Sequence, residues 1–597
     1  MIKYYSNIIT QNNIEINTLL KRRSQLSIAR FFSFIIALVA FMRLAIMGFT
    51  IIIFFIIVTF TFFFILSLVY YNKKSKRFYY LNKQSAVCEN EIKVLKGDFS
   101  YFKDGSQFID KNHAYACDLD LFGQGSLFQM INRTTTYVGY KRLAYCFLNL
   151  LAEPSSISEI QECVKELRLE KIVLLNYQTA FSCEVFNEND ETIREKILNY
   201  FENTNTFHIN RFVQLILYVV PVLNILFIVA LTQLPEIWPF FSITIIIQGI
   251  AFYYLKKRIK VSHHILSTIG REIFKYDQIL MFIKNEEFKS PKLLEISNNV
   301  NSVLSALKKL KGFLSAFDNN DNLLVEVVFN VLLLRDIKIA IKLGQWKEKN
   351  QHLFFKTEQI VAEFEFLISL SQFSSNNNTT VFPIINEQAD QLFIAKDLGH
   401  PIIPSTNRIN NSFETKSLGN MYIITGANMA GKSTFLRTIG VNFVLASIGS
   451  SVCASYYEFK PCPLFTSMRT TDSLGKNESY FYAEVLRLKK LKDIIGKGLP
   501  SLIIADELFS GTNSEDKQKA SIAFIKNLLK YNKLTTFIAT HDLSVTELEK
   551  EYSDKIMNYC FEIEHTRTVI SYDYKIKRGI TKSHNALILL NQLGILD

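Results

Sequence analysis

The apolar residues of this chain form two long blocks and, nearer the C-terminus, three short runs. The long blocks cover residues 31–70 and 212–255, and each is interrupted once by a short turn-forming stretch. About 20 apolar residues make one helical crossing of a bilayer, so each block is long enough for a hairpin of two crossings. The pattern predicts four transmembrane spans, in hairpins at residues 26–70 and 211–255.

Charges beside these blocks predict how the spans are oriented. Basic residues flank both hairpins: Lys21, Arg22, Arg23, Lys73, Lys74, Lys76 and Arg77 around the first, and Arg211, Lys256, Lys257, Arg258 and Lys260 around the second. Because lysine and arginine are enriched on the cytoplasmic side, we expect a multi-pass membrane protein whose soluble parts are all cytoplasmic. Buried core helices are the alternative, which the length of the blocks disfavours.

The three short runs, at residues 421–425, 502–505 and 534–539, predict buried strands of an α/β domain. The first run leads directly into a phosphate-binding loop of the pattern G-x-x-x-x-G-K-[ST]. The loop consists of Gly426, Ala427, Asn428, Met429, Ala430, Gly431, Lys432, Ser433 and Thr434. An apolar helical pattern follows it, so strand, loop and helix stand in the order that nucleotide binding requires.

The residue types of this loop are those that hold phosphates. Its two glycines allow a tight turn, whose backbone N–H groups point at the phosphates together with the N-terminus of the following helix. Lys432 is expected to reach the β and γ phosphates, and the Ser433 hydroxyl to bind a bridging Mg²⁺ ion. The loop therefore predicts a protein that binds a nucleotide with Mg²⁺.

Two further motifs predict hydrolysis. Asp506 and Glu507 end the second strand, where we expect Asp506 to hold Mg²⁺ through water and Glu507 to orient or polarise the attacking water. His541 ends the third strand, where a sensor of the γ-phosphate would lie. Lys432, Glu507 and His541 are thus the predicted catalytic residues, and Ser433 and Asp506 the predicted metal ligands.

Together these motifs resemble the MutS family of mismatch-repair ATPases. The resemblance is carried by residues 426–434, by Asp506-Glu507-Leu508 with Gly511-Thr512-Asn513-Ser514 after it, by Ala539-Thr540-His541 and by the signature-like segment 479–484. It implies Mg²⁺-dependent hydrolysis of ATP by an ABC-type domain that works as a composite homodimer. It also implies that Ser479 reaches the γ-phosphate bound by the other subunit, and that Asn428 faces that subunit.

The resemblance extends upstream to residues 118–139, which are similar to the opening of the family's helical core. The implied fold class is an α/β P-loop ATPase domain of the ABC type at the C-terminus, preceded by an all-α MutS-like core that transmembrane helical hairpins interrupt. The expected divisions are a cytosolic N-terminal helix (1–25), the first hairpin (26–70), the first part of the core (71–210), the second hairpin (211–255), the second part of the core or lever (256–380) and the ATPase domain (381–597).

Binding of DNA is implied by the resemblance alone. The net charge of +12 does not predict it, since much of the excess lies beside the spans, where anionic lipid would meet it. No segment before residue 72 matches a mismatch-reading domain. The segment Phe364-Glu365-Phe366 lacks the spacing of the family's mismatch wedge, so we expect it to pack in the core. A mismatch-repair-like or other DNA transaction is therefore expected of a variant without the mismatch-recognition domain.

Two other functions fit parts of the pattern. One is half of an ABC-type transporter, since spans and an ATPase share one chain, but no Leu-Ser-Gly-Gly-Gln sequence lies between the two nucleotide motifs. The other is a membrane scaffold that binds nucleotide without turnover, although Lys432, Glu507 and His541 are all present. The eight cysteines show no C-x-x-C spacing, which disfavours a zinc site.

Overall fold

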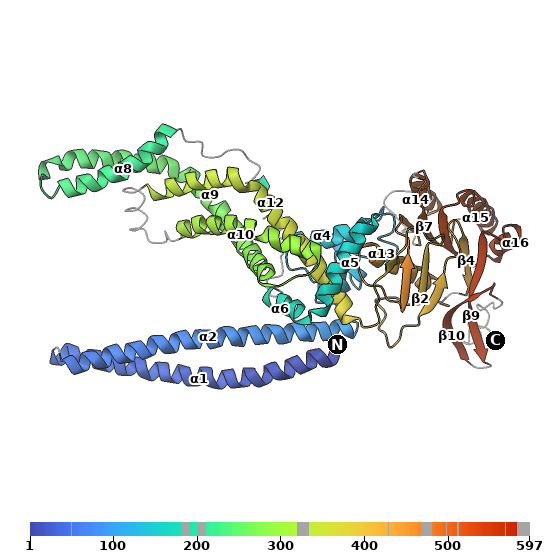
Figure 1. The fold of residues 1–597 in the computed structure, drawn as a ribbon, viewed down its shortest axis with the longest axis horizontal. Helices are drawn as coiled ribbons and strands as arrows, with labels where there is room; N and C mark the ends of the chain where they lie inside the picture. The colour runs from blue at the N-terminus through green and yellow to red at the C-terminus, as the bar shows by residue number, and fades with distance from the viewer. Residues whose placement is uncertain are drawn as a thin grey trace. The chain divides into compact units, whose positions relative to one another are not determined.

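We describe a computed structural model of the chain, in which residues 1–48, 50–181, 192, 194–196, 198–199, 211–318, 334–427, 429–468, 480–496, 498–509, 513–566 and 569–581 are described. The chain forms two compact units, Met1–Arg133 with Leu143–Glu184 and Leu367–Asp597, and Thr134–Arg142 with Val185–Phe366. The N-terminal part is mostly helical and an α/β region follows at the C-terminus (Figure 1), which confirms the predicted fold class at this level.

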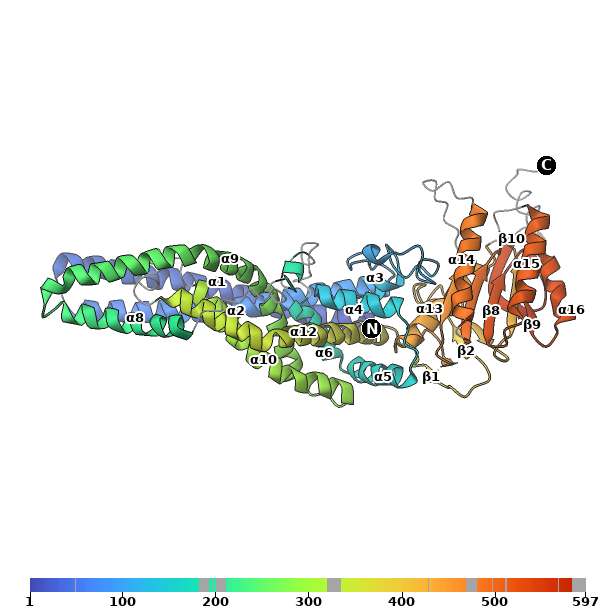
Figure 2. The ribbon, with the colours of Figure 1, turned by 90° about the horizontal axis from the view of Figure 1, so that it is seen from above.

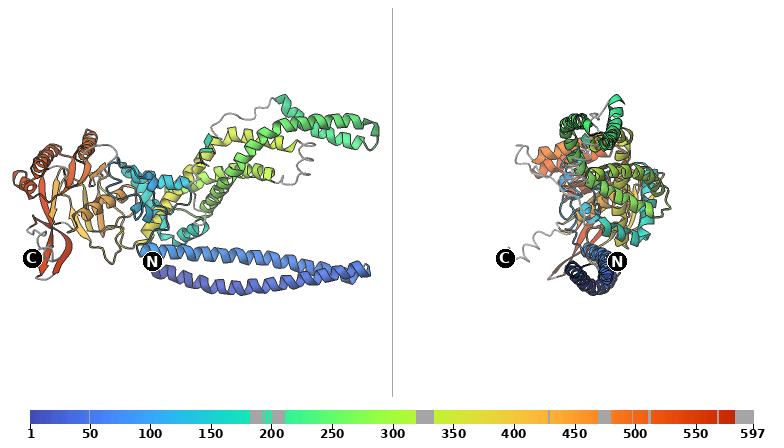
Figure 3. Two further views of the ribbon diagram at one scale, coloured as in Figure 1. Left: turned by 180° about the vertical axis from the view of Figure 1, so that it is seen from behind. Right: turned by 90° about the vertical axis from the view of Figure 1, so that its left-hand side faces the viewer.

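Two long helices, α1 (Ile2–Met47) and α2 (Ile51–Leu95), form an N-terminal hairpin. They lie side by side along their length (Figure 3). Most of their large apolar side chains point outward, and Ile52, for example, is 71% exposed. At 1.5 Å per residue each helix is about 70 Å long, so both helices continue well past the predicted spans.

Among the described residues, α1 and α2 are the two helices with the length and apolar composition to cross a bilayer. The predicted second hairpin is present as α8 (Arg211–Ala230) and α9 (Trp238–Asn285). Its described apolar stretches, Tyr218–Ala230 and Pro235–Ile250, are shorter. Two candidate spans are therefore found among the described residues, and the two predicted spans of the second hairpin are not supported there.

The other described helices before the α/β region lie in the stretch predicted as the helical core. They are α3 (Leu127–Ile131), α4 (Tyr137–Leu148), α5 (Pro154–Leu169), α6 (Lys171–Phe181), α10 (Pro291–Asp318) and α12 (Arg335–Asn376). In the second unit, the Glu365 carboxylate accepts hydrogen bonds from the backbone N–H groups of Thr135 and Thr136, at 2.8 and 3.1 Å. Phe364, Glu365 and Phe366 are fully buried, which confirms that this segment packs in the core.

A buried polar network joins the foot of the hairpin, the end at Tyr5 and Glu91, to the end of α12 within the first unit. Glu91 on α2 accepts hydrogen bonds from Arg133 Nε and Nη2, at 2.6 and 3.0 Å. Asn376 Nδ2 donates to the same carboxylate at 2.6 Å, and Tyr5 OH donates to Asn376 Oδ1 at 2.9 Å. Because an unpaired buried charge is costly, this network fixes where the hairpin joins the core.

The C-terminal region is built on a six-stranded sheet in the order β10-β9-β4-β8-β7-β6. Its strands are β4 (Met421–Gly426), β6 (Leu464–Ser467), β7 (Ser501–Asp506), β8 (Leu534–Ala539), β9 (Ile556–Thr566) and β10 (Val569–Arg578), of which β10 alone pairs in the antiparallel sense. The three strands predicted from the sequence, β4, β8 and β7, are neighbours. Their carboxyl ends therefore share one edge of the sheet.

Among the described residues, a smaller sheet and four α-helices complete this region. The smaller sheet contains β1 (Ile384–Ile385), β5 (Tyr456–Phe459), β2 (Phe393–Leu398) and β3 (Asn411–Glu414), and the helices are α13 (Lys432–Ser447), α14 (Tyr480–Ile495), α15 (Ser514–Leu528) and α16 (Leu548–Glu551).

Successive residues of β4 pack on opposite faces of the large sheet. Ile423 belongs to a core that includes Ile525 of α15, and α14 and α15 lie beside the strands in Figure 2. On the other face, the ring of Tyr422 stacks on Phe537 with centroids 4.8 Å apart, and both contact Phe413 of the smaller sheet. The sheet is thus covered on both sides, as is usual for parallel sheets.

Candidate nucleotide-binding site

The predicted phosphate-binding loop connects β4 to α13 at the carboxyl edge of the sheet. Gly426 has a φ of 148°, and a Cβ atom there would lie 2.8 Å from Phe561 O. Gly431, with a φ of 107°, immediately precedes the helix. Glycine adopts these angles without strain, so it permits the bend that leads the chain into α13. The first N–H groups of that helix have no partner within it, which makes this end suited to anions.

Lys432 lies folded under the loop and is 5% exposed. Its Nζ atom donates to Gly426 O at 2.6 Å and to Ala427 O at 2.9 Å. Burial lowers the pKa of Lys432, and the negative charges of Asp506 and Glu507 oppose that shift. A lysine held at this position can exchange the loop carbonyls for phosphate oxygens.

Ser433 and Asp506 meet beside Lys432. Burial raises the pKa of Asp506, while the hydrogen bond from the Ser433 hydroxyl lowers it. A hydroxyl and a carboxylate are the hard oxygen ligands that Mg²⁺ prefers, with water and phosphate as its other ligands. Among the described residues no cluster of three or more His, Cys, Asp or Glu side chains could hold a metal. The pair therefore fits an ion that arrives with the nucleotide's phosphates.

Glu507 and His541 form the second contact of the site. His541 Nε2 lies 3.0 Å from Glu507 Oε1 and 3.2 Å from Lys432 Nζ. Since a carboxylate only accepts and an ammonium only donates, we assign the proton on Nε2 to the bond with Glu507. This hydrogen bond is the main cause of the lowered pKa of Glu507, and Lys517 Nζ lies 3.7 Å from the other carboxylate oxygen. Glu507 is therefore ionised at neutral pH and held in one orientation.

The other predicted residues lie around this group or outside the described residues. Met429 is 78% exposed with a φ of 67°, Ala430 is buried, and Thr434 is exposed on the first turn of α13. Asn428 and Ser479 lie outside the described residues. The structure thus brings together five predicted side chains: Lys432, Ser433, Asp506, Glu507 and His541.

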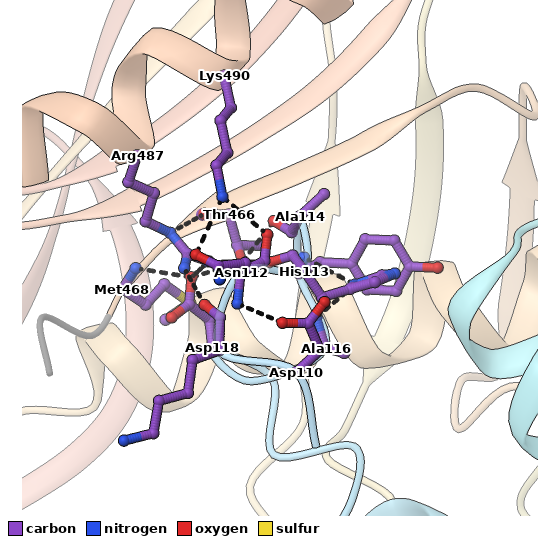
Figure 4. Close-up of polar contacts among 12 residues, drawn as sticks. Asp110, Asn112, His113, Ala114, Ala116, Asp118, Thr466, Met468, Arg487 and Lys490 are labelled. Carbon is purple, nitrogen blue, oxygen red and sulfur yellow. Dashed lines mark hydrogen bonds and ion pairs between the residues drawn. The ribbon is translucent and has the colours of Figure 1, made fainter. Parts of the chain in front are cut away.

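The loop that precedes α3 anchors the helical core to this region (Figure 4). Asp118 accepts hydrogen bonds from Arg487 Nη2 and from Thr466 Oγ1, both at 2.7 Å. Arg487 lies on α14 and Thr466 on β6, and the Asp118 side chain is 1% exposed. Two residues later, Asp120 pairs with Arg437 of α13 at 3.0 Å. Residues 118–120, at the opening of the core, therefore contact α13, which follows the predicted loop. They also contact α14, which contains most of the signature-like segment.

Sequence reasoning missed two charged side chains near the predicted catalytic residues. Lys517 contacts Glu507 but belongs to a helix whose charged residues give no signal of a special role. Glu484 is 3% exposed, and its Oε1 atom accepts the backbone N–H of Phe509 at 2.5 Å. Its place at the end of the signature-like segment was the signal that could have found it.

Comparisons with known proteins agree with the geometry. Residues 422–593 match the family model described as MutS domain V. The MutS protein homolog 4 of Mus musculus is 31% identical over 246 residues, which are 39% of this chain and 24% of that protein. The DNA mismatch repair protein MutS of Clostridium botulinum is 30% identical over 254 residues, 41% of this chain and 26% of that protein.

A longer match is found with the DNA mismatch repair protein MutS of Acetivibrio thermocellus, which is 27% identical over 319 residues, 52% of this chain and 33% of that protein. The chain thus spans a quarter to a third of the length of these relatives.

Proposed function

Since this chain belongs to the MutS family, we propose that it is a Mg²⁺-dependent ATPase whose ATPase domain comprises residues 381–597. The observation that carries the proposal is the convergence of five side chains at the carboxyl edge of the large sheet: Lys432, Ser433, Asp506, Glu507 and His541. ATP with Mg²⁺ would supply the transferable phosphoryl group and much of the neutralising charge.

Each of these side chains has a separate task in hydrolysis. Lys432 leaves its carbonyl partners and neutralises charge on the β and γ phosphates. Ser433 and Asp506 would hold the Mg²⁺ ion, which would neutralise charge on the phosphates. Glu507, kept ionised by His541, orients or polarises the attacking water. His541 touches both Glu507 and Lys432, so it is placed to respond to the γ-phosphate.

The proposal extends to a homodimer that closes when ATP is bound and reopens on hydrolysis. In such a dimer Ser479 would reach the γ-phosphate held by the second copy, and Asn428 of the loop would face that copy. The motion passes to the helical core, residues 71–210 and 256–380, through contacts such as that of Asp118 with Arg487. Relatives named for DNA mismatch repair support DNA as the partner that the core binds.

The N-terminal hairpin anchors this ATPase to a membrane in the proposed function. Its helices expose most of their large apolar side chains, and no more than 6% of the most apolar stretch of either helix is buried. Basic residues lie on both sides of this stretch, which favours a cytoplasmic position for everything outside it. The ATPase would therefore act at the cytoplasmic face of a bilayer.

The test is ATP hydrolysis by the full chain in detergent micelles, without DNA and with duplex, mismatched or branched DNA at one stated salt concentration. Lys432→Ala and Glu507→Gln should each lower kcat by roughly a hundredfold or more. Lys530→Ala, which removes an exposed lysine of the same domain, should hydrolyse ATP like the wild type.

The outcomes separate the parts of the proposal. Turnover that survives in both active-site variants would contradict the assigned site. If turnover depends on Lys432 but no DNA structure stimulates it, the assignment as an ATPase stands and DNA is not the partner. Uptake of a solute into vesicles driven by ATP would favour a transporter instead.

A further inference from the structure

Helix α14 presents two charged side chains to its neighbours from one side. Glu484 and Arg487 are three residues apart, a spacing that places them on the same face of a helix. Arg487 Nη2 donates to Asp118 at 2.7 Å, and Arg487 Nε donates to the backbone carbonyl of Thr466 at 3.1 Å (Figure 4). These bonds hold this part of α14 against β6 and the core loop. Glu484 lies one turn earlier on the same helix, so these bonds also hold the backbone that carries it.

Glu484 points at the loop that follows the two predicted active-site acids. Its carboxylate accepts the backbone N–H of Phe509 at 2.5 Å and is almost completely buried. Glu507 and Phe509 have φ values of 52° and 57°, in the left-handed region that residues other than glycine rarely adopt. A loop with two such residues persists only when its surroundings hold it.

The ring of Phe509 is held as well as its backbone. Its centroid lies 6.1 Å from that of Phe481 on α14 and 5.9 Å from that of Phe524 on α15. Phe509 is thus fixed by one hydrogen bond to a buried carboxylate oxygen and by two aromatic contacts.

We propose that Glu484 is a positioning residue for ATP hydrolysis: by holding the N–H of Phe509, it keeps the bent loop in the conformation that directs Glu507 toward His541. This inference rests on the proposed ATPase function. Glu484 does not touch the reacting atoms in this role, and it acts through the backbone of residues 507–509. Loss of the hydrogen bond lets the loop relax and moves the Glu507 carboxylate away from the attacking water.

The first test compares Glu484→Ala, Glu484→Gln and the matched control Asp493→Asn, which changes an exposed carboxylate on the same helix. In Glu484→Ala we expect kcat to fall roughly tenfold to a hundredfold, the loss typical of a misplaced catalytic group. The affinity for a fluorescent ATP analogue should stay close to that of the wild type, because Lys432 and Ser433 are untouched. Glu484→Gln keeps an acceptor oxygen without the charge and should recover part of kcat.

A wild-type kcat in Glu484→Ala would overturn the proposal. So would a parallel loss of nucleotide affinity and thermal stability without rescue by Glu484→Gln, since that pattern describes a purely structural residue.

A second readout separates this inference from the proposed function. The Phe509 amide should exchange with deuterium faster in Glu484→Ala than in the wild type, whether or not ATP is hydrolysed. If the wild type shows no Lys432-dependent turnover, the proposed function fails. If the wild type is active but the Phe509 amide exchanges at the same rate in Glu484→Ala, the proposed role of Glu484 fails.

Discussion

The N-terminal hairpin and the large sheet contain similar apolar residues, which are mostly exposed in the hairpin and buried in the sheet. Phe55 in the hairpin is 63% exposed, whereas Tyr422 and Phe537 in the sheet are fully buried. Helices α13, α14 and α15 and the smaller sheet cover the strands and supply their apolar surroundings. Within the described residues, the exposed part of the hairpin has no such cover. The α/β domain therefore buries its own apolar residues, whereas those of the hairpin are exposed, which supports the proposed membrane anchor.

Removal of the apolar half of the hairpin should have the largest effect. Arg23 Nη2 lies 3.2 Å from Tyr71 OH, so residues 27–70 can be excised and the two cut ends joined by a short turn. Burying one large apolar side chain is worth about 1.5–3 kcal/mol, and the excision removes many of them. We expect the wild type to float with lipid vesicles and the excised variant to stay in the aqueous fraction.

The excised variant should keep Lys432-dependent ATP hydrolysis, because the foot of the hairpin and its network around Glu91 remain. Flotation of the excised variant with vesicles would mean that another surface carries the attachment. Loss of floatation together with loss of ATP hydrolysis would mean that the two regions are not separable in the way that their opposite burial indicates.

The same difference explains what the sequence could predict. The strands, the loop and the acids of the candidate site were found because strand, glycines and charged residues lie within a few positions of one another. The continuation of the second hairpin helix to Leu95 was not, because hydrophobicity marks residues 31–70 whereas the end of this helix is polar. In the second apolar block the predicted helical hairpin is present, but its described apolar stretches do not support the two crossings.

Contacts between distant parts of the chain were beyond sequence reasoning. Arg487 and Asp118 are 369 positions apart, and no local pattern marks them as partners. Glu484 belongs to a recognisable segment, but its bond to the Phe509 N–H depends on two left-handed residues in a loop. Such conformations depend on the packed surroundings, which a single sequence does not display.

Substitutions at the foot of the hairpin should reduce local stability as substitutions in a buried core do, unlike substitutions in the exposed half of the hairpin. Glu91 and Arg133 are at most 2% exposed on their side chains, so Glu91→Ala leaves a buried arginine without its carboxylate. We expect a loss of about 3–5 kcal/mol in the local opening free energy, measured by hydrogen exchange of α2 near residue 91.

The matched control is Glu15→Ala, which removes a carboxylate that pairs with Arg77 on the surface of the same hairpin, where the two side chains are 42% and 50% exposed. An exposed pair contributes about 0–1 kcal/mol, so exchange should hardly change. Equal effects of the two substitutions would contradict the view that the foot of the hairpin is packed like a protein core.

The stability of the α/β region should also fall in acid more than that of the hairpin, although this effect is smaller than the others. The hairpin contains no histidine. In the α/β region, burial lowers the pKa of His400 to about 4, and the nearby Arg437 and Arg408 charges add to that shift. The Nδ1 atom of His400 is shielded from solvent and has no hydrogen-bond partner among the described residues.

The sign follows from the two pKa values. As pH falls below the ordinary value of 6.5, the unfolded chain binds a proton at residue 400 before the folded domain does. The stability contribution is therefore complete above pH 6.5 and is lost between pH 6.5 and 4, by at most about 3 kcal/mol. Scanning calorimetry of the α/β region should show His400→Gln losing less stability over this range than the wild type. His352→Gln, at an exposed histidine of α12, serves as the control. An identical pH dependence in the wild type and His400→Gln would mean that other groups set the acid limit of the domain.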